Sequence, residues 1–279
     1  MNHRSDQGDR RGGARIRLIA TDIDGTLLDS ENQVPPAHQR ALAAALERGV
    51  LLALATARKR TSTYAIAEQL GIPCACIAHN GARMWDWDGH ELRHLVVELD
   101  LAREIARFAD RLSIPLILTV DEMNYYSPAY PFNAVLRGAD DRQVASSLDA
   151  LSAPPTRIIA TGREGVDLLC DAFGSARDSI VVHRYYSREG SIVSAVLTHP
   201  RATKEDALAE LTQRIGVQPS EVLALGDAEA DAGMLRWAGV GVAMGNAMPE
   251  ARAAATWVAP THDEAGLAAA IERFVLTPE

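Results

Sequence analysis

The sequence predicts an α/β protein, with a Rossmann-like parallel sheet core interrupted by an inserted α/β domain. Two observations lead to this prediction. Short apolar runs alternate with helix-length segments near both ends of the chain, and such alternation produces a parallel sheet with right-handed crossovers. In the middle of the chain the alternation is lost, and most of the Trp, Tyr and Phe residues lie there. We therefore assign the core to residues 16–83 and 199–279, and the inserted domain to residues 84–198.

The first part of the core is expected to contain alternating strands and helices. Each expected strand is a short apolar run, which is typical of a buried strand. Pro35 stands where the first helix begins and Gly49 where it ends, and Gly71 ends the second helix. We expect strands at 16–22, 50–55 and 74–78, and helices at 35–49 and 61–70.

The inserted domain begins with the pattern of a β-hairpin, residues 84–97, with Asp88 and Gly89 at its turn. An amphipathic helix is expected at 101–112. The core alternation then resumes with a helix at 204–215. We expect the remaining core elements at 222–226, 228–238, 240–244, 249–255, 257–259 and 263–274.

Composition excludes several classes of protein. The chain has 28 Lys and Arg against 37 Asp and Glu, so its net charge is −9, and it has no basic block. Such a chain is poorly suited to nucleic acid or to an anionic membrane surface. No apolar run approaches the length of a membrane span. Residues 1–15 are polar and lack the apolar segment of a secretory signal, so we expect them to form a disordered leader outside the fold.

The three cysteines, Cys74, Cys76 and Cys170, are too few and odd in number for a disulfide framework. Cys74 and Cys76 have no matching second pair, which argues against a zinc site. A reducing cytoplasm is therefore the expected location.

Asp22 and Asp24 follow the first apolar run directly, and Gly25 lets the chain turn away. Alternate side chains of a strand point the same way, so the two carboxylates repel each other. Such a pair needs a shared proton or a hard cation with oxygen ligands, and this arrangement suits phosphoryl transfer. A calcium loop is excluded, because it requires Gly and Glu where Leu27 and Gln33 stand. A plain turn with solvated acids is the remaining alternative.

Three further polar clusters fall at ends of expected core strands or at the start of a helix. A Thr hydroxyl and nearby backbone N–H groups can hold phosphate oxygens. In an open parallel α/β sheet, ligands bind beyond the carboxyl ends of the strands, and all three clusters map to that edge. They are Thr56-Ala57-Arg58, Lys204, and Gly226-Asp227 with Asp231 one helical turn further on.

On these residues the chain resembles the haloacid dehalogenase superfamily and, within it, the Cof-like phosphatases. The resemblance covers about residues 16–83 and 199–274, and the segment between them matches a cap domain in position and length. The four motifs are Asp22-Ile23-Asp24-Gly25-Thr26, Thr56-Ala57-Arg58, Lys204, and Gly226-Asp227-Ala228-Glu229-Ala230-Asp231. Two further stretches similar to the subfamily are Asn80-Gly81-Ala82 and Gly241-Val242-Ala243-Met244-Gly245-Asn246-Ala247.

The resemblance implies a Mg²⁺-dependent hydrolase of a small phosphorylated metabolite, with a sugar phosphate as the favoured class, acting as a monomer or homodimer. Asp22 would be the nucleophile that forms an aspartyl-phosphate, and Asp24 the general acid and base, with Lys204 as the third catalytic residue. Mg²⁺ would be held by Asp22, the backbone carbonyl of Asp24, and Asp227. Asp231 would orient Lys204 or a water on the metal, and Asn246 would shape the last loop. Phosphate and substrate would be bound by Asp22, Ile23, Asp24, Thr56, Ala57, Arg58 and Lys204.

Two residues depart from the family pattern. Ala57 stands where these phosphatases usually carry Gly, and Ala230 where they usually carry Asn. The second change removes a side chain that is expected to hydrogen-bond near the phosphate. It leaves open a catalytically weakened phosphometabolite-binding protein. A phosphosugar mutase of the same superfamily is the other alternative, because an aspartyl-phosphate can return its phosphate to a sugar.

Several other side chains carry two interpretations. The cap tyrosines form either a sugar-stacking surface or the core of the cap. The cationic side chains either contact substrate or face solvent. The tyrosines are Tyr125, Tyr126, Tyr185 and Tyr186, and the cationic residues are Arg58, His183 and Arg184.

Overall fold

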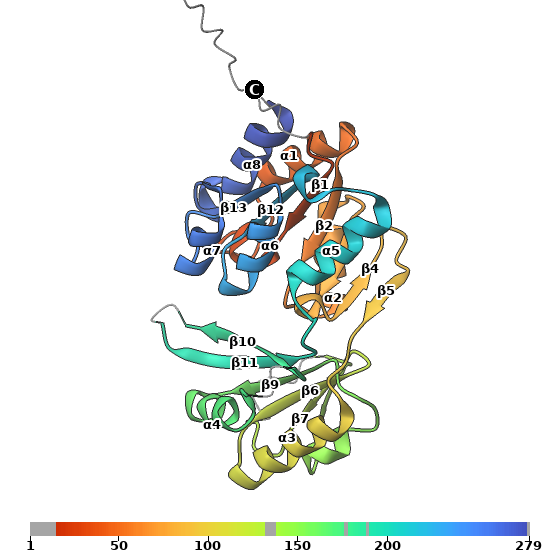
Figure 1. Cartoon of the computed structure of the whole chain (residues 1–279), viewed down its shortest axis with the longest axis vertical. Coiled ribbons are helices and arrows are strands. Elements are labelled where there is room, and N and C mark those ends of the chain that lie inside the picture. Colours follow the sequence, from red (N-terminus) through yellow and green to blue (C-terminus); the bar gives the residue numbers. More distant parts are fainter. Residues whose placement is uncertain (1–14, 132–137, 176–177, 188–189, 278–279) are drawn as a thin grey trace, which may run out of the picture.

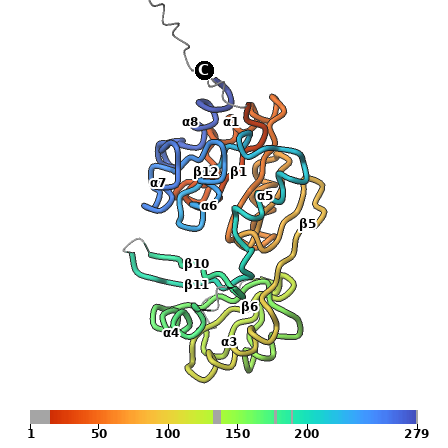
Figure 2. Tube along the Cα trace, in the orientation of Figure 1, coloured from red at the N-terminus to blue at the C-terminus, as the bar shows by residue number. Residues whose placement is uncertain are grey.

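The protein consists of two α/β units, each built on its own sheet, as the computed structural model shows (Figure 1). The Cα trace in Figure 2 leaves the larger unit, forms the smaller one and returns. This confirms the predicted α/β class with a parallel core and an inserted second sheet. The predicted leader, residues 1–15, lies outside the described residues except for Arg15. The described residues are 15–131, 138–175, 178–187 and 190–277.

The sheet of the larger unit has, within the described residues, the strand order β14-β13-β12-β1-β2-β3-β4-β5. Strands β14 to β3 run parallel to one another, and β4 and β5 are antiparallel to their neighbours. The strands are β1 (Leu18–Thr21), β2 (Leu51–Ala55), β3 (Ala75–Ala78), β4 (Arg83–Trp85), β5 (Glu91–His94), β12 (Val222–Gly226), β13 (Val240–Ala243) and β14 (Trp257–Val258).

Helices cover both faces of this sheet, which is why its strands are apolar throughout. Ile19 of β1 packs in one cluster with residues of α1, α2 and α8, whereas Leu18 and Ala20 face α5, α6 and α7. The helices are α1 (Pro36–Glu47), α2 (Arg60–Leu70), α5 (Lys204–Ile215), α6 (Ala232–Trp237), α7 (Pro249–Ala254) and α8 (Gly266–Ile271). The predicted helix at 228–238 therefore starts later, after a 3₁₀ turn at Glu229–Asp231.

The hairpin β4–β5 was expected to open the inserted domain, and the structure corrects this assignment. Cys76 to Ala78 of β3 pair with Arg83 to Trp85 of β4, so the hairpin extends the core sheet. The physical reason is burial. Met84 and Trp85 are almost fully buried and pack into the two hydrophobic clusters on opposite faces of that sheet.

The second sheet has the order β10-β11-β9-β6-β7-β8. Helices α3 (Leu99–Leu112) and α4 (Arg163–Phe173) pack on one face of it through a separate hydrophobic cluster. The other face lies toward the larger unit (Figure 1). The strands are β6 (Leu116–Val120), β7 (Met123–Tyr126), β8 (Asp141–Gln143), β9 (Arg157–Thr161), β10 (Val181–Tyr186) and β11 (Ile192–Thr198). In the part of the chain that is described, no helix is both long and apolar enough to span a membrane.

Candidate active site

The polar clusters that the sequence predicts come together at the carboxyl edge of the core sheet. Asp22 continues β1, and its backbone N–H donates to Leu225 O of β12 at 2.9 Å. Thr56 continues β2, and its N–H donates to Ile77 O of β3 at 2.8 Å. Because neighbouring parallel strands end at the same edge, residues far apart in sequence meet there.

The centre of this edge is a buried ion triad. Lys204 Nζ lies 2.6 Å from Asp22 Oδ1 and 2.6 Å from Asp231 Oδ1. All three residues are at most 5% exposed. Lys204 is placed at the first position of α5, whose preceding residue Thr203 caps the helix through its side chain. The other oxygen of Asp231 accepts the N–H groups of Asp227 and Ala228, so both of its oxygens are engaged.

Negative charge exceeds positive charge at this triad. Burial, together with repulsion from Asp231 and Asp227, raises the pKa of Asp22 well above its usual value despite the nearby Lys204. Burial and repulsion from Asp231 raise the pKa of Asp227 to about 7. Burial opposes the charged form of Lys204, but the two carboxylates outweigh it and raise its pKa. The site therefore favours protons or a further cation.

Carboxylate oxygens of Asp22, Asp227 and Asp231 lie within 4.8 Å of one another and could hold a metal ion. Both oxygens of Asp231 are engaged by Lys204 and two backbone N–H groups. Asp227 accepts only two longer hydrogen bonds of 3.3 Å from neutral side chains, and Asp22 contacts Lys204 through one oxygen, so these two carboxylates are better placed to hold a cation. Every donor in this set is an oxygen, which suits a hard divalent cation.

A tight turn brings the first motif against Asp227. Gly25 has a φ of 75°, and a Cβ there would lie 2.3 Å from Asp227 Oδ2, so only glycine fits. Thr26 Oγ1 donates to Asp227 Oδ1 at 3.3 Å. Asn246 Nδ2 donates to Gly25 O at 2.8 Å and to Asp227 Oδ2 at 3.3 Å. The Asn246 side chain therefore connects this turn to Asp227. The sequence analysis expected Asn246 to shape a loop near the site.

Asp24 and Arg58 meet at the mouth of the site. Arg58 Nε donates to Asp24 Oδ2 at 2.9 Å, and its Nη2 lies 2.5 Å from Oδ1. The Thr56 hydroxyl is buried and accepts the backbone N–H of Arg58 at 3.1 Å. The sequence left Arg58 either in contact with substrate or facing solvent. In the structure its guanidinium is not simply solvated but contacts Asp24. Ile23 points its side chain into the apolar core, so it has only backbone groups to offer a ligand.

The smaller unit contributes side chains that sequence reasoning missed. Arg157 of β9 donates from Nη1 to Ala57 O at 2.7 Å. Glu122, in the β6–β7 turn, contacts His79 Nε2 at 3.1 Å and Arg83 Nη1 at 2.7 Å. Burial lowers the pKa of His79 to about 4, so this histidine is neutral in the pair. A charged residue that opens an apolar strand was the available signal for Arg157.

Of the cap tyrosines, Tyr125 fits the core of the cap and Tyr185 contacts the larger unit, and the sugar-stacking surface stays a prediction. Tyr125 packs against the hydrophobic cluster of the smaller unit. The Tyr185 hydroxyl instead faces the larger unit and exchanges hydrogen bonds with the Asn80 side chain, at 2.8 and 3.2 Å. Asn80 thus contacts the cap directly. It has a φ of 56°, in the left-handed region, within the segment that leads to β4.

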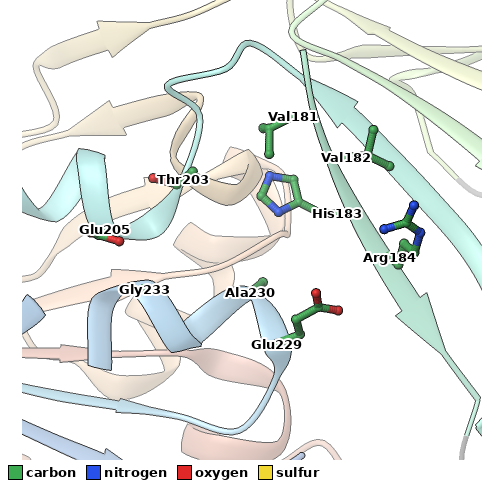
Figure 3. Close-up of a pocket in the computed structure, with 9 residues that line it drawn as sticks. All are labelled: Val181, Val182, His183, Arg184, Thr203, Glu205, Glu229, Ala230 and Gly233. Atoms are coloured by element: carbon green, nitrogen blue, oxygen red, sulfur yellow. The ribbon is translucent and has the colours of Figure 1, made fainter. Parts of the chain in front are cut away.

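A pocket of about 220 Å³ opens between β10 and the start of α6 (Figure 3). The cap side carries His183, whose Nε2 donates to Ala202 O at 3.1 Å and whose pKa burial lowers to about 4. Ala230 faces it from the fourth motif, so the small side chain noted in the sequence borders open space. The lining residues are Val181, Val182, His183, Arg184, Thr203, Glu205, Glu229, Ala230 and Gly233.

A family model and several known proteins match this chain over most of its length. The family model described as haloacid dehalogenase-like hydrolase matches residues 19–271. The 5-amino-6-(5-phospho-D-ribitylamino)uracil phosphatase YcsE of Bacillus subtilis is 26% identical over 96% of this chain and 99% of its own. The HMP-PP phosphatase of Serratia proteamaculans is 27% identical over 84% of this chain and 85% of its own.

Solved structures show the same fold. BT1666 from Bacteroides thetaiotaomicron, from a study of haloalkanoate superfamily phosphatases, has a TM-score of 0.82 at 23% identity, covering 97% of this chain and 99% of its own. The subclass IIB sugar phosphatase BT4131 has a TM-score of 0.78 at 24% identity, covering 92% of this chain and 98% of its own.

Proposed function

The chain belongs to the haloacid dehalogenase-like hydrolase family and is a phosphoric monoester hydrolase, and we propose that it acts on small phosphorylated metabolites through a covalent phosphate on Asp22. The observation that carries the proposal is the buried contact between Lys204 Nζ and Asp22 Oδ1, at 2.6 Å. This contact keeps the Lys204 ammonium beside the phosphate that Asp22 would attack.

The first step forms a bond between Asp22 and phosphorus and breaks the bond from phosphorus to the alcohol oxygen. Asp24 enters this step protonated and released from its ion pair with Arg58, gives that proton to the departing alcohol, and is left as a carboxylate. In the second step water attacks phosphorus, Asp24 takes a proton from that water, and the bond to Asp22 breaks. The products are the alcohol and inorganic phosphate, and Asp22 is regenerated.

Lys204 and Thr56 hold the phosphoryl oxygens during both steps. The Lys204 ammonium is oriented by Asp231, which is buried and cannot turn away without leaving backbone N–H groups unpaired. Thr56 offers a buried hydroxyl at the end of β2. The N–H groups of Ile23 and Ala57 are placed by the same turns and complete the donors that we assign to the phosphate.

We assign Mg²⁺ to Asp22 and Asp227, with the backbone carbonyl of Asp24 as the third protein ligand. The raised pKa values of Asp22 and Asp227 support this assignment, because a cation would relieve their repulsion. When bound, the ion neutralises the charge that accumulates between the carboxylates and the phosphate.

The thiols of Cys74, Cys76 and Cys170 are free, in keeping with the reducing location that we expect.

The test is turnover of a broad panel of phosphate esters with Mg²⁺ and then with EDTA. We expect release of inorganic phosphate that stops with EDTA and returns when Mg²⁺ is added. A wild-type protein that binds phosphate esters but releases no phosphate would instead support the binding-protein alternative. Transfer of phosphate to a second sugar hydroxyl, rather than to water, would support the mutase.

A further inference from the structure

The face of the second sheet that looks toward the catalytic edge carries a buried arginine, Arg157 (Figure 1 shows the strand, β9). Side chains alternate along a strand. Ile158 and Ala160 of β9 pack in the hydrophobic cluster under α3 and α4, so Arg157 lies on the opposite face. The Tyr185 hydroxyl reaches Asn80 of the larger unit from the same sheet.

The Arg157 guanidinium is held by a chain of hydrogen bonds. Nη1 donates to Ala57 O at 2.7 Å, and Nε donates to Thr119 Oγ1 at 3.1 Å. Thr119 Oγ1 in turn donates to Asn124 Oδ1 at 2.8 Å, and Asn124 Nδ2 donates to Asp141 Oδ1 at 3.0 Å. This network orients the guanidinium before any ligand arrives.

One nitrogen of this guanidinium stays available. Among the described residues, Arg157 Nη2 has no hydrogen-bond partner, and it does not belong to their fully enclosed unpaired atoms. Within the same residues no carboxylate lies at ion-pair distance from Arg157. Glu122 is close enough to oppose the lowering of the Arg157 pKa by burial, but its Oε1 contacts His79 and Arg83, and its Oε2 accepts the backbone N–H of Arg60.

A buried cation without a paired carboxylate is costly, and a ligand anion would offset that cost. Ala57, which anchors Arg157, lies between Thr56 and Arg58 in the loop that we assign to the phosphate. The hydrogen bond from Arg157 to Ala57 O, at 2.7 Å, therefore places the guanidinium next to that loop, on the cap side of it.

We propose that Arg157 is a specificity residue that binds a negatively charged group on the alcohol, so that preferred substrates carry a second anionic group such as a carboxylate or a further phosphate. This proposal rests on the proposed phosphatase function. It assigns the substrate class to a contact from the cap, whereas the core motifs handle the phosphoryl group that all candidate substrates share.

The experiment compares phosphate esters in matched pairs that differ by one anionic group, such as 3-phosphoglycerate and glycerol 3-phosphate. We expect the wild type to favour the anionic member of each pair. Arg157→Gln should lower kcat/KM for the anionic members by about 10- to 100-fold, mainly through KM, and change the neutral members little. Arg157→Lys should retain part of the preference, because lysine keeps the positive charge but lacks the planar set of N–H donors of the guanidinium.

Arg163→Gln is the matched control, because it removes an exposed arginine from the same unit, and its side chain is 77% exposed. It should leave both members of each pair unchanged. A wild type that hydrolyses both members equally well, or an Arg157→Gln variant that loses both equally, would overturn the role of Arg157 while leaving the phosphatase function intact. Absence of wild-type turnover across the whole panel would instead refute the proposed function and, with it, this inference.

A second measurement needs no variant and therefore does not depend on how Arg157→Gln folds. Glycerate and glycerol are tested as competitors of a neutral ester hydrolysed by the wild type. Glycerate should inhibit at a concentration about 10-fold or more below that of glycerol, because it supplies the carboxylate for Arg157. Equal inhibition by the two compounds would contradict the proposal.

Discussion

Arg58 contacts both carboxylate oxygens of Asp24, with Nε 2.9 Å from Oδ2 and Nη2 2.5 Å from Oδ1. The pair joins the turn after β1 to the start of α2, so it fixes the proposed proton carrier relative to the phosphate loop. Hydrogen bonding to Asp24 raises the pKa of Arg58, and Arg58 stays charged. The same guanidinium also lies close enough to Asp22 for the two charges to interact.

Arg58→Gln should therefore reduce kcat more than it changes protein stability. Asp24 would remain present but lose the contact that orients it, and misplaced catalytic groups cost about 10- to 100-fold in rate. The measurement is kcat for one good substrate, with thermal unfolding in parallel. Arg40→Gln, on the exposed side of α1, removes the same charge away from the site and should match the wild type. Equal kcat for Arg58→Gln and the wild type would show that Arg58 does not position Asp24.

Asp22 and Asp231 both contact Lys204, yet their substitutions should have different consequences. Asp22→Asn should abolish turnover, by about 10⁴- to 10⁶-fold, because an amide is a poor nucleophile. It should leave the free energy of unfolding close to that of the wild type, since it also removes charge repulsion. Asp231→Asn should lower that free energy by about 1–3 kcal/mol, because one amide cannot satisfy Lys204 and two backbone N–H groups.

Urea unfolding and a turnover assay on the two variants check this pair of expectations. If Asp22→Asn hydrolysed esters at the wild-type rate, the covalent mechanism would be wrong. If Asp231→Asn were as stable as the wild type, Asp231 would not hold the turn before α6 in the way the hydrogen bonds indicate.

Titration of Asp227 should make the metal-free protein less stable as the pH rises toward 7, in opposition to the buried His79 and His183, whose lowered pKa values act the other way. Burial and repulsion from Asp231 raise the folded-state pKa of Asp227 to about 7. The folded state thus binds a proton more tightly than the unfolded state does, and stability that is present below pH ~4 is lost as the pH rises through about 7. Asp22 shifts in the same direction. The free energy of unfolding should fall by ~1–4 kcal/mol.

Thermal unfolding in EDTA between pH 5 and pH 8 measures this effect, and Mg²⁺ should raise Tm most at the upper end of that range. Asp227→Asn should flatten the pH dependence and weaken the response to Mg²⁺. A Tm difference between the metal-free wild type and Asp227→Asn that stays constant over the same interval would contradict the raised pKa of Asp227.

Ala230 borders the pocket beside the ion triad, where the resemblance to Cof-like phosphatases leads one to expect Asn. Ala230→Asn should add a hydrogen-bond donor near the phosphate and raise kcat/KM for a small ester by about 2- to 10-fold. Ala230→Leu fills the same space without a donor and is the matched control. If both variants lowered kcat/KM equally, the open space itself would be what Ala230 provides, and the added donor would be of no use.

Local pattern was sufficient for the strands of the parallel core and for the residues that follow them. Asp22, Thr56 and Asp227 each stand directly after an apolar run, and parallel strands bring their carboxyl ends to one edge. Their convergence could therefore be predicted without coordinates, because it depends on strand direction rather than on packing. The resemblance implied that Asp231 orients either Lys204 or a water on the metal, whereas the contact of Lys204 with Asp22 comes from the structure.

The hairpin β4–β5 was recognised as a hairpin but assigned to the wrong unit. Its alternating pattern and its turn at Asp88 and Gly89 are local, whereas its pairing partner, β3, is chosen by which apolar surface it covers. Met84 and Trp85 are buried on opposite faces, a fact that depends on α2, α5 and the rest of the core.

The contacts between the two units are the part that only the folded chain decides. Arg157 meets Ala57 and Tyr185 meets Asn80 across separations of 100 and 105 residues. The sequence by itself specified the elements, the catalytic edge and the presence of an inserted domain, because these follow from periodicity and from side chains next to strand ends. Which cap residues face that edge depends on the register of β9 and β10 and on the path of two connecting segments, and no local pattern encodes either.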